Sequence, residues 1–171
     1  MTYKKISFYL FIPTILIIMF PVITRIYHVY LYSQRPQVEN FVPAEMKLFL
    51  SVGASFWHAQ LSENGSIVCR WATLREPEHE MEKVVSPTPQ DWKNFFDTCE
   101  SLNVWNWRGN YRDKNLADGL QWGVLLNYPG RAVDINASNR YPPNAQRNES
   151  IEFQDFWDAV LCLLHQDRFW E

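Results

Sequence analysis

The chain has 171 residues, of which 47% are apolar, 16% aromatic and 20% charged. This composition excludes an intrinsically disordered chain, because disorder needs low hydrophobicity and a high net charge. Four of the 16 basic residues and none of the 19 acidic residues lie in the first 36 positions, so the remainder carries a net charge of −7. Nucleic-acid binding needs clustered Lys and Arg, and such an acidic domain is therefore not expected to bind nucleic acid.

An uncharged apolar stretch fills residues 6–24, directly after Lys4 and Lys5. As a helix this stretch would reach about 28 Å, which is close to the hydrocarbon thickness of a bilayer. A cleaved signal peptide is the alternative, but its apolar core is shorter and ends at a small-residue cleavage site, which is missing here. We expect an uncleaved membrane anchor over residues 1–32, with residues 6–24 in contact with the membrane.

The charges that flank this stretch predict its orientation. Lys4, Lys5 and the terminal amine precede it, and Arg25 and Arg35 follow it. Because positive charge is retained on the cytoplasmic side, the excess of one charge favours a single-pass protein with its N-terminus inside. A polar, proline-marked linker over residues 33–43 then leads to a soluble domain over residues 44–171, which we expect on the extracytoplasmic side, in the periplasm.

Strand-favouring residues dominate the first part of this domain, over residues 46–52 and 56–61. Asn64-Gly65 is a strong signal for a tight turn, because both central positions of that turn need a positive φ. A hairpin with a strand over residues 66–74 is therefore predicted. The charged, proline-bounded residues 75–87 are typical of a loop, with a short strand around Val84-Val85.

A helix is predicted from Thr88 onward. Thr88 is a hydroxyl cap, Pro89 suits the first helical position, and Asp91 meets the helix dipole. Apolar residues then recur with helical spacing and predict a buried face made of Trp92, Phe95, Phe96, Cys99 and Leu102.

The second half repeats this order. Residues 120–128 and 131–137 predict a hairpin around Pro129-Gly130, and residues 151–165 predict a second amphipathic helix. Residues 91–97 resemble residues 152–158 at an offset of 61 positions. We expect an α+β domain of order ββαββα, in which two helices cover one face of a four-stranded antiparallel sheet. Two ββα repeats would explain the similarity of the helices, and a chance match between two aromatic amphipathic helices is the alternative.

The segment between the helices is dense in aromatic residues. Tryptophan rings beside Arg and Asn can stack on a sugar or a peptide and orient it with hydrogen bonds. Alternatively, the same rings fill the interface between sheet and helices. On the first interpretation, the candidate ligand-binding residues are Trp105, Trp107, Arg108, Tyr111, Trp122, Asn139 and Tyr141.

The common sequence motifs of catalytic sites are missing from the chain. No serine lies in Gly-x-Ser-x-Gly, no phosphate-binding loop is present, and the four histidines have no metal-ligand spacing. Cys69, Cys99 and Cys162 are far apart and are expected to be buried thiols. We therefore expect no catalytic residue, metal or cofactor.

Part of the chain resembles an uncharacterised bacterial domain. The motifs that carry the resemblance are Val104-Trp105-Asn106-Trp107, Asp118-Gly119-Leu120-Gln121-Trp122, and Asn139-Arg140-Tyr141-Pro142. They match a pattern of Val-Trp-x-Trp, Asp-Gly-x-x-Trp and Gly-x-Asn-x-Tyr-Pro, except that Ala137 replaces the glycine. The resemblance spans residues 90–165 and implies a bacterial source without an assigned activity.

These observations favour a single-pass bacterial envelope protein whose domain binds a protein or a surface ligand. A membrane-tethered hydrolase acting on an envelope polymer is the first alternative, with Asp113, Asp118 or Asp134 as candidate carboxylates. An immunity or inhibitor protein is the second, because an acidic surface suits a basic toxin.

Overall fold

A computed structural model describes residues 41–73, 76–108, 110–113, 119–144 and 148–169, all of which belong to the compact unit Val38–Glu171. Its strands are β1 (Glu45–Val52), β2 (Ser55–Leu61), β3 (Ile67–Thr73), β4 (Glu76–Val85), β5 (Asn110–Arg112), β6 (Leu120–Tyr128) and β7 (Arg131–Ser138). Its helices are α2 (Pro89–Ser101), the short 3₁₀ helix η1 (Val104–Asn106) and α3 (Ile151–Leu163).

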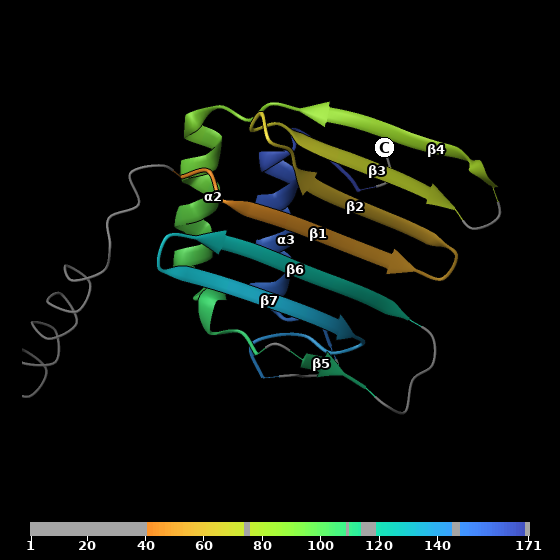
Figure 1. The fold of residues 1–171 in the computed structure, drawn as a ribbon. Helices are drawn as coiled ribbons and strands as arrows, with labels where there is room; N and C mark the ends of the chain where they lie inside the picture. The colour runs from red at the N-terminus through yellow and green to blue at the C-terminus, as the bar shows by residue number, and fades with distance from the viewer. Residues whose placement is uncertain (1–40, 74–75, 109, 114–118, 145–147, 170–171) are drawn as a thin grey trace, which may run out of the picture. The chain divides into compact units, whose positions relative to one another are not determined.

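The strands form one sheet in the order β4-β3-β2-β1-β6-β7-β5. Neighbouring strands are antiparallel, except that β5 runs parallel to β7. The central strand β1 pairs with β2 on one side and with β6 on the other, and so joins the two halves of the chain. Both helices lie on the same side of the sheet (Figure 1).

The predicted four-stranded antiparallel sheet of order ββαββα is therefore wrong. The sheet has seven strands and is mixed, with four strands before α2 and three between α2 and α3. Residues 76–85 form a strand at the edge of the sheet, where charged side chains such as those of Glu80 and Glu82 reach water. The unequal strand arrangement also contradicts two ββα repeats.

Local signals placed the turns and helix starts correctly. Gly65 has a φ of 84° between β2 and β3, and Gly130 has a φ of 74° between β6 and β7. The Thr88 hydroxyl accepts a hydrogen bond from the Asp91 backbone N–H, and the Asp91 carboxylate accepts one from the Thr88 backbone N–H. This reciprocal capping satisfies two backbone donors that the helix itself leaves without partners. At the start of α3, the Ser150 hydroxyl accepts a hydrogen bond from the Phe153 backbone N–H.

Aromatic rings fill the space between the sheet and the helices. Trp57 of β2 meets Trp157 of α3 with ring centroids 6.3 Å apart, and Trp122 of β6 meets Phe153 at 5.1 Å. Alternation along each strand sends these side chains to the helical side. The two helices therefore bury most of one face of the sheet.

Two further expectations concern membrane contact and the cysteines. The anchor predicted over residues 1–32 lies outside the described residues, as does most of the linker over 33–43. Among the residues that the structure does describe, no helix has the length and apolar character needed to cross a membrane.

Cys69 and Cys99 are buried as expected, whereas Cys162 is exposed on α3.

Replacement of Phe156 tests this packing. Its fully buried ring contacts Phe95 of α2 and Trp157 of α3, with centroids 6.0 and 5.3 Å away. We expect Phe156→Ala to lower the free energy of unfolding by about 3–5 kcal/mol, because it removes buried surface and leaves a cavity. Urea denaturation of the full chain in detergent measures this loss.

The exposed Ile151 on the same helix provides the control. Ile151→Ala should change the free energy of unfolding by no more than about 0.5 kcal/mol. Equal effects of the two substitutions would contradict the proposed core.

Candidate functional site

Of the seven residues predicted to bind a ligand, the structure brings Trp107, Tyr111 and Trp122 together. Trp105 instead packs against Tyr128, at the other end of β6. Tyr111 and Trp122 are fully buried and stack with ring centroids 5.7 Å apart. Trp107, at 7% exposure, meets the edge of Trp122. Tyr141 packs against Phe153 of α3 at 4.8 Å. These rings form part of the core, which is the alternative that the sequence left open.

Hydrogen bonds within the chain occupy the polar atoms of several of these residues. The Trp122 indole donates to the Arg140 carbonyl at 3.0 Å, and the Tyr111 hydroxyl accepts from the Arg108 backbone N–H at 2.8 Å. Trp105 is half-buried and donates to Glu100. Asn139 is buried, whereas the Arg108 side chain is exposed. A ligand-binding role for the seven residues stays a prediction.

Of the three carboxylates proposed for a hydrolase, the two that the structure describes, those of Asp113 and Asp134, do not converge. Asp113 is buried at the end of β5, where its Oδ2 lies 3.0 Å from Nη2 of Arg140. Asp134 is exposed in the middle of β7, four residues from Ser138, whose carbonyl accepts from the Asp113 backbone N–H. Four strand residues span about 13 Å, too far for a shared catalytic site of two carboxylates. Asp118 lies outside the described residues.

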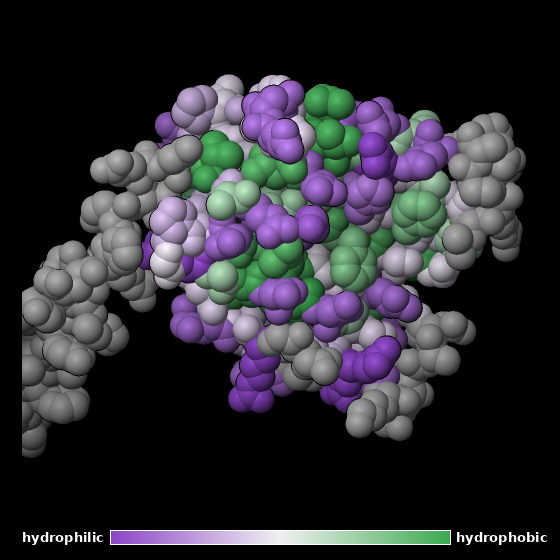
Figure 2. Space-filling model, in the orientation of Figure 1, coloured by the Kyte–Doolittle hydropathy of each residue, from purple (hydrophilic) through white to green (hydrophobic). Residues whose placement is uncertain are grey.

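The sheet face opposite the helices offers a different candidate. We call it the open face, because no described element covers it (Figure 1). It carries charged residues, as expected for a solvated face, but also partly exposed apolar side chains. Figure 2 shows apolar and hydrophilic residues interspersed on this face. Its large apolar residues are Phe49, Phe56, Val68, Val84 and Leu125.

The Phe49 ring lies close to the backbone of the neighbouring strand. Its partner in the register is Gly123 of β6. A Cβ atom added to Gly123 would lie only 2.0 Å from Cε1 of Phe49, so the ring occupies the space that a larger residue would need. Glycine at this position therefore lets the aromatic ring rest on the backbone of β6.

Beside Phe49, a row of polar side chains crosses the open face toward β4. Register pairs place Phe49 opposite His58, His58 opposite Arg70, and Arg70 opposite Glu82. Arg70 Nε lies 2.6 Å from Glu82 Oε2 and 3.8 Å from Glu80 Oε1. We call His58, Arg70 and Glu82 the polar row.

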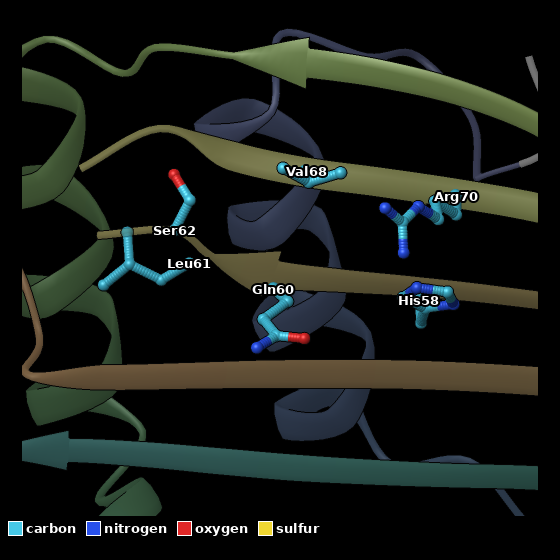
Figure 3. Close-up of a pocket in the computed structure, with 6 residues that line it drawn as sticks. All are labelled: His58, Gln60, Leu61, Ser62, Val68 and Arg70. Carbon is cyan, nitrogen blue, oxygen red and sulfur yellow. The ribbon is translucent and has the colours of Figure 1, made fainter. Parts of the chain in front are cut away.

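A shallow depression of about 190 Å³ opens along this row. Figure 3 shows the side chains of His58 and Arg70 projecting from β2 and β3, with Gln60 and Val68 beside them. Leu61 and Ser62 close the end nearest the turn to β3. Imidazole, guanidinium, amide and aliphatic groups therefore meet in one place, where they can contact both polar and apolar parts of a bound molecule.

Burial and neighbouring charges determine the charge of each residue in the polar row near neutral pH. Partial burial lowers the pKa of His58 and the charge of Arg70 lowers it further, while Glu80 opposes them weakly, so the neutral imidazole is favoured at pH 7. The hydrogen bond to Glu82, together with its charge, raises the pKa of Arg70. The row thus presents a neutral ring, a cation and an anion in order toward the edge of the sheet.

Sequence reasoning did not find this face as a site. Glu80 and Glu82 belong to residues 75–87, for which the sequence predicts a loop. The signal that could have found them is the alternation of glutamate at positions 76, 78, 80 and 82, which fits a strand with one charged face. Register between distant strands then decides which residues become neighbours.

Within the described part of the chain, no group of three or more His, Cys, Asp or Glu side chains could hold a metal ion. The sequence matches no protein-family model, and no curated protein matches it. The geometry of the open face therefore carries the functional interpretation.

The close approach of Phe49 to Gly123 yields a prediction. We expect Gly123→Ala to destabilise the protein by about 1–3 kcal/mol, because the new methyl group displaces the Phe49 ring from the sheet. Urea denaturation measures the loss. The double variant Gly123→Ala/Phe49→Ala should lose less stability than the sum of the two single variants. Additive effects would contradict this contact.

Proposed function

We propose that this protein is a membrane-attached binding module of the bacterial envelope, which recognises a partner protein through the open face. The observation that carries the proposal is the exposure of aromatic and aliphatic side chains, among charged ones, on an uncovered sheet face. The outer face of such a sheet is ordinarily polar. An exposed apolar patch within a charged rim is typical of protein interaction sites.

The size of the depression favours a partner protein over a small molecule. Its volume of about 190 Å³ falls below the roughly 300–1,000 Å³ that small-molecule sites occupy. A single side chain of a partner would fit such a space. Val68, which lines the depression, and Phe49, which lies opposite His58, supply the apolar surface that surrounds an inserted side chain at protein interfaces.

The net charge of the domain indicates which class of partner it binds. The residues beyond position 36 carry a net charge of −7, which opposes binding to nucleic acid or to anionic lipid. An acidic domain associates faster with a basic protein, because opposite charges steer the encounter. The partner is therefore a protein with a basic surface.

Residues 6–24 support the membrane part of the proposal. Their length and apolar character suit a segment that inserts into a bilayer, and Lys4 and Lys5 favour retention of the N-terminus in the cytoplasm. The domain then faces the periplasm, where it meets envelope proteins rather than cytosolic ones.

Site-specific photo-crosslinking tests the proposal. A photoreactive amino acid at Gln60 lies beside the polar row, and the same amino acid at Asp158 lies on the exposed side of α3. In cells that produce the full chain, we expect a discrete protein adduct from position 60 and none from position 158, because only the open face contacts the partner. Immunoblotting after irradiation detects the adduct.

Fractionation of the same cells tests the attachment. The chain should sediment with membranes, and deletion of residues 6–24 should release it into the soluble fraction. The proposed binding face fails if position 60 gives no adduct or if both positions give the same adducts. Release of the intact full chain from membranes would contradict the anchor alone.

A further inference from the structure

The two edges of the sheet differ in a way that bears on binding. At one edge, β5 is only three residues long and follows β7 in parallel. At the other, β4 is the longest strand of the sheet, with ten residues, and no described strand pairs with its outer side. Its pairing to β3 is regular from Met81 to Val85. A register shift interrupts this pairing between Met81 and Glu76, so the regular part of the edge, from Met81 to Val85, is the part that can hydrogen-bond to an additional strand through its backbone.

Side chains along this edge show which strand would fit. Val84 and Met81 are the exposed apolar residues, with 59% and 52% of their surface accessible. Glu82 follows Arg70 in the polar row, and Glu80 lies near the same guanidinium. Cross-strand pairs are favourable between opposite charges and between apolar residues. The position next to Glu82 therefore suits a cation, and the position next to Val84 suits an apolar residue.

The same charges discourage a second copy of the chain. If two β4 strands paired in antiparallel fashion around Glu80 or Glu82, glutamates would face each other on the open face. Like charges directly opposite each other destabilise a strand pair. The edge thus resists self-pairing but attracts a basic segment.

We propose that the edge of β4 accepts an extended basic segment of a partner protein as an eighth strand. The segment carries Lys or Arg opposite Glu80 and Glu82 and an apolar residue opposite Val84. It runs antiparallel to β4, like the other long pairs of the sheet. This proposal rests on the proposed binding function and specifies which residues the partner carries. The added strand places a Lys or Arg next to Glu82 and so extends the polar row by one cation.

A blocked peptide of sequence Thr-Val-Thr-Lys-Val-Lys-Thr is the probe. In antiparallel register it places Val opposite Val84, both lysines opposite Glu82 and Glu80, and its second Val opposite Met81. We expect saturable binding to the full chain in detergent, measured by fluorescence anisotropy, and slower hydrogen exchange of the β4 amides. The peptide with Glu in place of both Lys should not bind.

Two peptide derivatives separate strand addition from charge attraction. Successive backbone N–H groups of a strand point to opposite edges, so methylation of alternate nitrogens removes the donors of one edge only. We expect one of the two alternately methylated peptides to bind at least about tenfold more weakly, because it loses several backbone hydrogen bonds to β4. The other should bind nearly as well as the unmodified peptide.

Variants of the chain test the charges. Glu80→Gln/Glu82→Gln should weaken binding roughly threefold to tenfold, since two opposite-charge pairs are lost. The control Glu152→Gln/Asp158→Asn removes two carboxylates from α3 and should leave the affinity unchanged. All four carboxylates belong to residues with accessible surface, so both variants should fold.

Three results would overturn the edge proposal: no binding of the peptide, equal binding of both methylated peptides, or equal effects of the two double variants. Protection of β4 amides that grows with protein concentration without peptide would also overturn it, because it would assign the edge to a second copy. If crosslinking at Gln60 persists in any of these cases, the proposed function stands and only the strand addition fails.

Discussion

The packing of aromatic rings between α3 and the sheet is the interaction on which the rest of this structure depends. Phe153, Phe156 and Trp157 occupy successive turns of one helix face and meet rings from β2, β6 and the segment after α2. Large rings bury much apolar surface with few rotatable bonds, so a small domain gains stability from them efficiently. This layer holds strands from both halves of the chain against one helix.

Because both helices pack on the same face of the sheet, the side chains of the other face are exposed. Because α2 and α3 bury one face, the residues that alternate with the core along β1, β2, β3 and β6 face outward. On those strands the outward positions include Phe49 and Leu125 as well as His58 and Arg70. One face of the sheet thus contributes to stability, and the other face, built from the same strands, is the one proposed to bind a partner.

Local rules predicted the elements whose signals lie within a few residues. The Asn64-Gly65 turn, the Pro129-Gly130 turn and the Thr88 cap depend on backbone preferences of the residues themselves. The number and pairing of strands depend on distant contacts. Nothing near β1 indicates that β6 will be its partner, and the three residues of β5 become a strand only because β7 lies beside them. The charged residues of β4 predict a loop when they are considered alone. They form a strand because β4 lies at the edge of the sheet.

The candidate site shows the same limit. Residue type correctly drew attention to Trp107, Tyr111 and Trp122 as rings that need a partner, but type does not tell whether that partner is a ligand or the core. Topology brings these rings together with α3 and buries them. The polar row arises from three strands whose register aligns His58, Arg70 and Glu82, and register is set by the whole sheet rather than by any one segment.

The central claim is that a partner covers the open face in the native membrane. Cysteine labelling measures this coverage directly. In a Cys162→Ser background, the two remaining native cysteines are buried, so Gln60→Cys and Asp158→Cys can each be labelled selectively with N-ethylmaleimide. An occupied open face predicts that Gln60→Cys reacts several-fold more slowly in native membranes than in the purified chain, while Asp158→Cys reacts equally in both. Equal labelling of Gln60→Cys in the two preparations would contradict it.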